Sequence, residues 1–388
     1  MAYYGKFRGS ELPTPITIGG YMMLQSFLFK IKDHRRKQGQ RYQLGHILLF
    51  SIFAILGKAT SYRRIHAFIK ANYQALDEVF SLNWKRVPAY TTIRAIIQDT
   101  SPAEMEASFR QYSADLAEEK DKKRFVTIDG KVLRGSFDHF QDQKAIQILS
   151  AFLPDSQIIL AHEEISEKTN EIPTAQELIL KLGLSGCIFT FDALHCQEET
   201  LKAAAETNND VIVQVKGNQK TWVKDGIRTS ETRVPLDVYQ EPITQVRNRI
   251  ERRGVEVFSA EEISDSEKWD LVKAIVKVTR EREVFDTRTK SWKSSEEISF
   301  YISTLVLSAK EFCQAIRDHW GIENKNHYVR DVTMGEDRSR IRTNPHLFAK
   351  LRSFALNIIR ANKVQNVSLE LFNNCMNLDN ILNYAGIK

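Results

Sequence analysis

Cysteines are scarce in this sequence. The 388-residue chain has four, Cys187, Cys196, Cys313 and Cys375, with no Cys-x-x-Cys pair and no His/Cys ladder at zinc spacing. This scarcity argues against a disulfide-stabilised fold and against a cysteine-based zinc site. We therefore expect incidental thiols in a reducing cytosol.

Long apolar runs and targeting signals are also missing. The longest apolar run, residues 47–56, is shorter than the roughly 20 residues of a membrane-spanning helix, so we expect a buried helix there. Residues 1–10 lack the charged-then-apolar pattern of a signal peptide. The sequence therefore predicts a cytoplasmic protein without a membrane partner.

Charge of one sign is not in large excess. The formal net charge is +6 and the pI about 8.9, a mildly basic balance that permits a nucleic-acid partner without requiring one. The hydrophobic content of 42% and the charged content of 27% indicate a folded globular chain. Its length exceeds that of one typical domain.

Periodicity divides the chain into four regions. Apolar residues at three- and four-residue spacing predict an N-terminal helical domain over 1–120, followed by a charged linker at 118–124. Short β-branched runs alternating with helical runs predict the first part of an α/β core over 121–221, with a mixed sheet flanked by helices. A β-rich insertion is expected at 222–300. Returning helical periodicity predicts the C-terminal part of the core at 301–388.

A basic cluster over 30–41 and a short helical run after Pro88 suggest a task for the N-terminal domain. Together they predict a helix-turn-helix-like DNA-binding module. Its candidate DNA contacts are Arg35, Arg36, Lys37 and Arg94. A helical cap on the core is an alternative interpretation that stays open.

Three acidic residues are the candidate catalytic groups. Asp129 and Asp192 each follow an apolar strand and precede a small residue, a placement that suits a metal ligand held on a rigid element. Glu323 lies in a helical stretch, on a face expected to be packed, where an unpaired carboxylate is costly. The alternatives are turn or N-cap aspartates, and an ion pair of Glu323 with Arg317 or Arg330.

Polar and basic residues surround these acids in the sequence. The candidate DNA contacts are Lys131, Arg134, Lys216, Asn218, Gln219, Arg249, Arg252, Arg253, His319, Asn324, Lys325, Arg338 and Arg340. Phosphate contacts would make DNA affinity depend strongly on salt. Solvated turns, an exposed strand face and ion pairs around the glutamate explain many of them equally well.

Two histidines flank the glutamate in the same stretch. His319 and His327 each stand four residues from Glu323, so the three share one helical face. For a Mg²⁺ site with oxygen ligands, phosphate or carboxylate contact is favoured for these histidines over a metal role.

Six ordered motifs carry a resemblance to a known family. They are IDGKVLRGS (128–136), KTNEIPTAQELI (168–179), FDALHCQ (191–197), VKGNQ (215–219), the glutamate block 319–345 and LRSFALNIIR (351–360). In these motifs the chain resembles DDE insertion-sequence transposases related to the H-repeat-associated proteins, and the N-terminal region is similar to the domain that precedes their core. The resemblance covers nearly the whole chain.

The resemblance implies a fold, a site and partners. The fold would be an RNase-H-like core with an N-terminal helical DNA-binding domain. Asp129, Asp192 and Glu323 would be the acidic triad for two Mg²⁺ or Mn²⁺ ions, with Asp129 shared between them. The expected partner is double-stranded DNA, both transposon ends and target, bound by a homodimer in the bacterial nucleoid.

The reaction implied by the resemblance has two steps. Hydrolysis of a phosphodiester at the transposon end exposes a 3′-OH, which then attacks target DNA by transesterification. The alternatives are a domesticated or inactive DNA-binding relative, an RNase-H-like nuclease without strand transfer, and a phosphohydrolase acting on small molecules.

Overall fold

A computed structural model describes residues 17–18, 21–117, 124–137, 144–165, 170–260 and 269–387. The linker predicted at 118–124, apart from its last residue, and the N-terminal segment 1–10 lie outside the described residues. The chain packs as two compact units, one made of Met1–Glu118 with Thr343–Lys388 and the other of Glu119–Arg342. The predicted last region, 301–388, is therefore divided between the two units.

The first unit is helical, apart from two short paired strands. Its elements are β1 (Thr17–Ile18), β2 (Tyr21–Met22), α1 (Leu24–Leu28), α2 (Leu44–Leu56), α3 (Tyr62–Ala71), α4 (Tyr73–Phe80), α5 (Tyr90–Gln98), α6 (Pro102–Leu116), α11 (Pro345–Ala361), α12 (Val367–Met376) and α13 (Leu378–Leu382). Every residue of α2 is buried, as its apolar run predicts. The C-terminal α11 packs on α2 and α6, which explains why the chain end belongs to this unit.

A mixed sheet forms the second unit. Its strands are β3 (Arg124–Val132), β4 (Gln147–Leu153), β5 (Ile158–Ile165), β6 (Cys187–Phe191), β7 (Asp210–Val215), β8 (Asp237–Gln240), β9 (Thr244–Val246), β10 (Arg249–Ser259), β11 (Ala274–Asp286) and β12 (Ser291–Ser303). Their order is β5-β4-β3-β6-β7-β12-β11-β10-β8, with β9 on β10.

Among the helices of the described residues, none combines the length and the apolar character that a membrane span requires.

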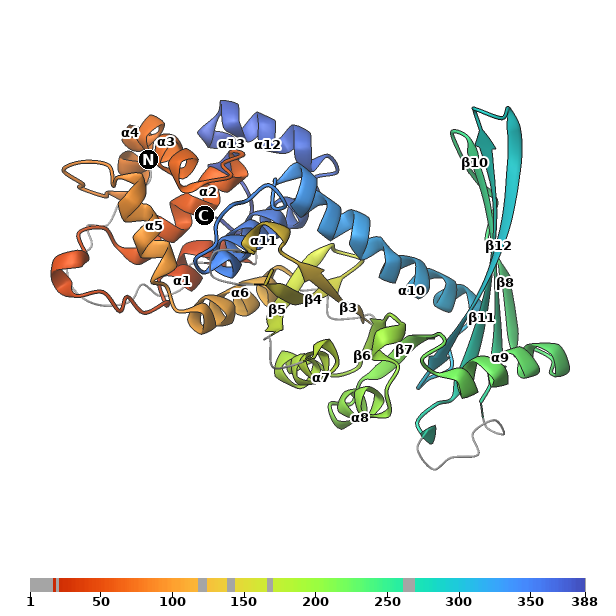
Figure 1. The fold of residues 1–388 in the computed structure, drawn as a ribbon. Coiled ribbons are helices and arrows are strands. Elements are labelled where there is room, and N and C mark those ends of the chain that lie inside the picture. Colours follow the sequence, from red (N-terminus) through yellow and green to blue (C-terminus); the bar gives the residue numbers. More distant parts are fainter. Residues whose placement is uncertain are drawn as a thin grey trace. The chain divides into compact units, whose positions relative to one another are not determined.

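The first five strands make the core of this unit. β4 lies antiparallel between β3 and β5, whereas β6 and β7 run parallel to β3. The crossover helices α7 (Glu171–Leu182) and α8 (Glu198–Glu206) pack against each other beside the sheet (Figure 1). This order and these directions give an RNase-H-like α/β core, so the expected fold class is confirmed.

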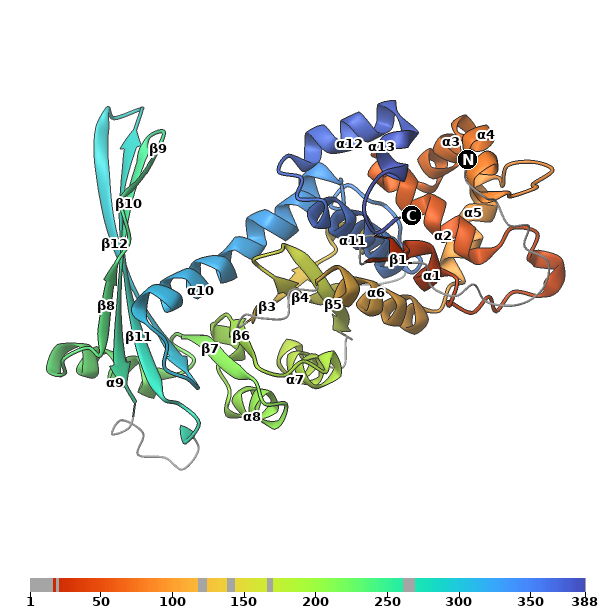
Figure 2. The ribbon, with the colours of Figure 1, turned by 180° about the vertical axis from the view of Figure 1, so that it is seen from behind.

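The predicted β-rich insertion continues the core sheet. β12 pairs with β7 through Phe300–Ser303 only, and the rest of β12 projects beyond the core with β10 and β11 (Figure 2). The base of this extension is apolar and packs on α10 (Ala309–Ile322) through side chains such as Val257, Val276 and Phe312. The insertion also contains a helix, α9 (Lys220–Thr232), which the β-rich pattern did not predict.

α10 leads directly into the segment that carries the glutamate. Its start is fixed by a capping box between Ser308 and Glu311. Its end continues as two π-helical segments, η5 (Glu323–His327) and η6 (Val329–Thr333). π-helical turns are rare and are frequent at functional sites.

Candidate active site

The two aspartates lie level with each other on neighbouring strands. Asp192 directly follows β6, as predicted, whereas Asp129 lies within β3, which continues to Val132, so the predicted strand end at Asp129 is wrong. β3 and β6 are parallel neighbours, and their register pairs Thr127 with Thr190. Asp129 and Asp192 are each two residues beyond that pair, so both stand at the same edge of adjacent strands, which are spaced about 4.8 Å apart. The hydroxyls of the two threonines lie 3.0 Å apart and join the strands just below this edge.

Glu323 reaches the same edge from η5. Asp129, Glu323 and His327 each offer a ligand atom, and these atoms all lie within 4.8 Å of one another. Asp192 is not in this closest group. Its Oδ1 accepts a hydrogen bond from the backbone N–H of Leu194 at 3.0 Å and caps the short turn η3 (Ala193–His195), so the predicted N-cap role is present in the structure.

Glu323 was expected on a packed helical face, or in an ion pair with Arg317 or Arg330, and the structure shows neither. The side chain is exposed, whereas its neighbour Ile322 is buried. Arg317 pairs with Glu241, and Arg330 pairs with Glu336. Among the described residues Glu323 has no ion-pair partner, so the carboxylate is free to bind a ligand.

Two histidines set the electrostatics around Asp129. His327 Nε2 donates a hydrogen bond of 2.9 Å to Asp129 Oδ2. Burial acts to raise the pKa of Asp129, but the hydrogen bond and charge of His327, with the charge of His319, lower it below its usual value. Burial lowers the pKa of His319, against the opposing effects of Asp129 and Asp192. These interactions favour an ionised Asp129 carboxylate.

His319 itself is a structural residue. Its side chain is buried, and Nδ1 lies 3.2 Å from the hydroxyl of Thr190. This burial contradicts the predicted DNA contact of His319.

A fourth carboxylate, that of Glu171, lies at this edge and is not among the residues predicted from the sequence. A Cβ atom added to Gly130 would stand 2.5 Å from Oε1 of Glu171, so the glycine after Asp129 leaves room for this side chain. The same Oε1 is 3.4 Å from Nε2 of the buried His195. The motif 168–179 carries Glu171 at the first turn of α7 and was the available signal; residues 168–169 of that motif are outside the described residues.

The Lys-Gly-Asn-Gln motif after β7 supports the second aspartate. Asn218 Nδ2 donates to the carbonyl of Ala193 at 2.6 Å, and Gln219 Nε2 donates to that of Cys196 at 2.8 Å. These amides hold the turn that follows Asp192. Asn218 and Gln219 therefore position this turn, and their predicted DNA contacts stay predictions, since Asn218 is exposed and Gln219 is partly exposed.

Lys131 belongs to a buried charge network. Its side chain is only 5% exposed and pairs with Asp331 and, at 2.8 Å, with Glu336. Glu336 also accepts a hydrogen bond of 3.0 Å from Arg330, which is buried. Lys131 therefore joins β3 to the segment after Glu323, and its burial contradicts the predicted phosphate contact.

The arginines of β10 are engaged with acids of β10 itself and of the neighbouring strand β11. Arg249 and Arg253 pair with Glu251, and Arg252 lies 3.1 Å from Glu283. Partial burial acts to raise the pKa of Glu251, but hydrogen bonds and charges of Arg280 and Arg249 lower it to about 2. The arginines of the predicted phosphate-binding strip are thus ion-paired on a strand face, and their contact with phosphate stays a prediction.

Other predicted DNA contacts are accessible. Arg134 is 78% exposed and only loosely paired with Asp337 at 3.6 Å. Asn324, Arg338 and Arg340 are also exposed. Lys325 is partly exposed and pairs with Asp318 at 3.2 Å.

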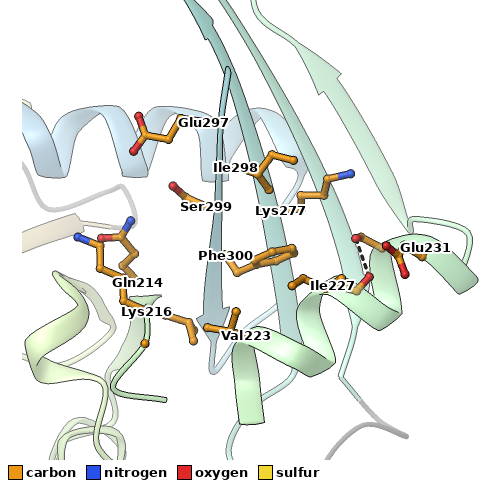
Figure 3. A pocket seen from close by; sticks show the side chains of 13 residues that line it. Gln214, Lys216, Val223, Ile227, Glu231, Lys277, Glu297, Ile298, Ser299 and Phe300 are labelled. Atoms are coloured by element: carbon orange, nitrogen blue, oxygen red, sulfur yellow. Dashed lines mark hydrogen bonds between the residues drawn. The ribbon is translucent and has the colours of Figure 1, made fainter. Parts of the chain in front are cut away.

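A pocket lies beside Lys216, where β7 ends and β12 continues past it. Its volume is about 690 Å³. Figure 3 shows Val223 and Ile227 of α9 facing Phe300 of β12, with Lys216 at the end of β7. The Lys216 ammonium also lies 5.9 Å from the ring centre of Trp320. Lys216 is exposed and directly follows β7, the parallel neighbour of β6. Its ammonium group therefore lies at the same edge of the sheet as the aspartates.

The predicted contacts in the helical unit fall into two kinds. Arg35 is held by Asp33 at 2.5 Å and by backbone carbonyls, so it is a structural residue. Arg36, Lys37 and Arg94 are exposed, and Arg94 lies on α5, the helix after Pro88. These three remain candidates for DNA contact.

Comparison with known proteins agrees with this arrangement. The family model described as "Transposase DDE domain" matches residues 120–358, and the model described as "DDE_Tnp_1-associated" matches residues 25–113. The chain therefore belongs to the family of transposases with a DDE domain.

Relatives were found in Escherichia coli (strain K12). The protein YbfL is 30% identical over 345 residues, covering 86% of this chain and 89% of YbfL. The H repeat-associated protein YhhI is 29% identical over 345 residues with the same coverage, 86% and 89%. The piggyBac transposase in its synaptic complex with hairpin DNA is 11% identical with a TM-score of 0.41, covering 91% of this chain and 77% of that one.

Proposed function

We propose that this chain cuts DNA at the ends of a mobile element and joins the freed 3′-OH ends to target DNA. Family membership supports the class of reaction. The observation that carries the proposal is the convergence of Glu323 on Asp129, with Asp192 level with Asp129 on the next strand. The three residues are far apart in the sequence, and no ion pair within the described segments accounts for Glu323.

The donor set fits divalent cations. Carboxylate oxygens are the ligands that Mg²⁺ and Mn²⁺ prefer, and Asp129, Asp192 and Glu323 would hold two such ions. When bound, the ions supply an activated water or hydroxyl nucleophile and neutralise charge on the leaving oxygen. The lowered pKa of Asp129 keeps this residue ionised and ready to bind.

The chain's own groups keep these carboxylates in place. Without a bound cation, His327 donates a hydrogen bond to Oδ2 of Asp129 and so holds this carboxylate in place. Asn218 and Gln219 hold the turn after Asp192. Ligand geometry of this kind requires support from surrounding hydrogen bonds.

The exposed cations are the proposed DNA contacts. Arg134, Lys216, Arg338 and Arg340 would contact phosphate near the cut, joined by the amide of Asn324 and by Lys325. Arg36, Lys37 and Arg94 would contact the element's ends through a helix-turn-helix-like domain. Since two ends are handled together, a homodimer on DNA is part of the proposal.

Phosphate contact is tested by salt dependence. Arg338→Gln with Arg340→Gln removes two exposed cations, so the slope of log affinity against log salt should fall by about two. Fluorescence anisotropy with end DNA at several salt concentrations measures this slope. An unchanged slope would remove both arginines from the proposed interface.

Cleavage is tested with DNA that carries the element's ends. We expect Mg²⁺- or Mn²⁺-dependent nicking and joining by the wild-type chain, and losses of about 10³-fold or more in Asp129→Asn, Asp192→Asn and Glu323→Gln, since each removes a charge from the metal site. Glu296→Gln, exposed on β12, is the matched control and should retain activity.

Different outcomes distinguish the alternatives. Nicking without joining would identify a nuclease of the same fold. DNA binding without any nicking would identify an inactive relative. Wild-type nicking by Asp192→Asn would contradict the proposed triad.

A further inference from the structure

We propose that Nε2 of His327 is a direct ligand of one divalent cation, together with Asp129 and Glu323, and that this nitrogen makes the position favour Mn²⁺ over Mg²⁺. The inference rests on the proposed function and deepens it. It also changes the expectation from sequence, which favoured phosphate or carboxylate contact for His327.

The spacing of the three groups suits a shared ion. Their ligand atoms lie within 4.8 Å of one another, and His327 Nε2 is 2.9 Å from Asp129 Oδ2. Two ligands at about 2.1 Å from an ion and at right angles to each other are about 3.0 Å apart. The observed separation of nitrogen and oxygen therefore matches one edge of an octahedral coordination shell.

The π-helical segment η5 places two ligands on one side of the helix. Glu323 and His327 are its first and last residues, four positions apart. Residues at this separation lie on the same helical face, and paired metal ligands on helices use the same spacing. Asp129 approaches from β3, and the pair of Lys131 with Asp331 joins β3 to η6, the segment that directly follows η5.

The orientation of the imidazole points to the same ligand. The His327 side chain is 6% exposed. Its Nδ1 is buried and has no hydrogen-bond partner in the part of the chain that the structure describes. The polar contact that the structure shows for the ring is therefore that of Nε2 with Oδ2 of Asp129, and the ligand atom that His327 offers lies within 4.8 Å of a carboxylate oxygen of Glu323. In the cation-bound site, the proton of Nε2 moves to Nδ1, and the neutral imidazole presents its Nε2 lone pair.

The nitrogen ligand gives the position its preference. Mg²⁺ binds oxygen ligands and loses water reluctantly, whereas first-row transition ions accept imidazole readily. Two carboxylates and one imidazole therefore favour Mn²⁺. A position formed by carboxylates alone has no such preference.

Mn²⁺ binding to the DNA-free chain tests the proposal directly. Free Mn²⁺ is followed by its EPR signal during titration, and Mg²⁺ by competition. In His327→Gln we expect at least an about tenfold loss of Mn²⁺ affinity at one position, and less than an about threefold change for Mg²⁺. Electron spin-echo spectroscopy of bound Mn²⁺ should show coupling to a directly ligated ¹⁴N in the wild type, and this coupling should vanish in the variant.

Two further variants make the result specific. His34→Gln removes an exposed imidazole from the other unit and should bind Mn²⁺ like the wild type. His327→Asp replaces nitrogen by oxygen, so it should keep cation binding while losing the preference for Mn²⁺. Circular dichroism establishes that each variant is folded; if His327→Gln does not fold, the wild-type ¹⁴N signal and His327→Asp decide the question.

The outcomes separate this inference from the proposed function. Wild-type chain without ¹⁴N coupling, or His327→Gln with unchanged Mn²⁺ affinity, overturns the ligand role of His327. Asp129→Asn and Glu323→Gln with unchanged Mn²⁺ affinity would instead overturn the cation site on which the proposed function depends.

Discussion

Charged side chains on the β10–β12 extension and those at the edge of the core sheet have different partners. On the extension, acids and bases pair across strands, as Arg252 does with Glu283 and Arg282 with Glu297. At the core edge, Asp129 meets an imidazole and Glu323 has no ion-pair partner among the described residues. Paired charges satisfy one another, whereas gathered carboxylates need a cation. The pairing therefore separates a structural surface from a candidate site.

A third arrangement lies just below the core edge. Lys131, Asp331, Glu336 and Arg330 are opposite charges that pair out of contact with most solvent. Burial acts to raise the pKa of Asp331, and Lys131 opposes that effect. Because burial makes an unpaired charge costly, the comparison predicts that the same kind of ion pair has a large effect here and a small one on the extension.

Lys131→Met should give the largest loss of stability. It leaves Asp331 and Glu336 with one buried cation fewer, and breaking such a pair costs about 3–5 kcal/mol. Urea unfolding followed by circular dichroism measures the loss. Lys131→Met with Asp331→Asn removes one charge of each sign and should recover part of it. Equal stability of the single and double variants would mean that charge pairing is not the cause.

Local sequence features could predict much of the fold and part of the site. The apolar run before Asp129 and the one before Asp192 identify strands, and their alternation with helices predicts the core that the structure confirms. The pairing of β12 with β7 was not predictable in this way, because it joins segments that local periodicity treats separately. The position of α11 against α2 and α6 is likewise a long-range contact.

Partners of charged residues were the hardest features to predict. The sequence places Lys131 next to Asp129 and invites a phosphate contact, yet Asp331, its partner, is 200 residues away. Glu171 was not predicted at the site, yet it lies there. Its side chain comes close to Gly130 only through the packing of the folded chain. Residue type and spacing do not encode such contacts, so burial and pairing had to come from the structure.

Glu251→Gln should have the next largest effect, and the effect should depend on pH. The folded-state pKa of Glu251 is about 2, below the ordinary 4.5. Its contribution is therefore present above pH 4.5 and lost as the pH falls from about 4.5 to about 2. Because its partners Arg249 and Arg280 are partly exposed to screening solvent, we expect Glu251→Gln to lose about 1–2 kcal/mol of stability at pH 6.

Unfolding of wild type and Glu251→Gln between pH 2 and 6 measures this difference. The two stability curves should converge at low pH. Glu296→Gln, at an exposed position of β12, is the control and should follow the wild type throughout. A gap between wild type and Glu251→Gln that stays constant with pH would contradict the assignment to Glu251 ionisation.

Asn218→Ala tests whether similar hydrogen bonds at the edge of the core sheet and on the β10–β12 extension differ in function. Asn218 donates to Ala193 beside Asp192, and Asn248 donates to Phe285 on the extension. Each alanine variant loses one amide-to-carbonyl bond and about 1 kcal/mol of stability. Only Asn218→Ala should also slow DNA nicking, by about tenfold, because it loosens the turn after Asp192. Equal nicking by both variants would show that this bond does not position the aspartate.

Arg252→Met should have the smallest effect, although Arg252 contacts two acids, Glu281 at 3.6 Å and Glu283 at 3.1 Å. The side chain is 47% exposed, and exposed ion pairs contribute about 0.2–1 kcal/mol. Because the arginine is already paired, the salt dependence of DNA affinity should stay as in the wild type. A stability loss as large as that of Lys131→Met would erase the distinction between buried and exposed pairs. A decrease of about one in the slope of log affinity against log salt would instead show that the extension binds phosphate. Arg252 would then exchange its ion pairs with Glu281 and Glu283 for a contact with DNA.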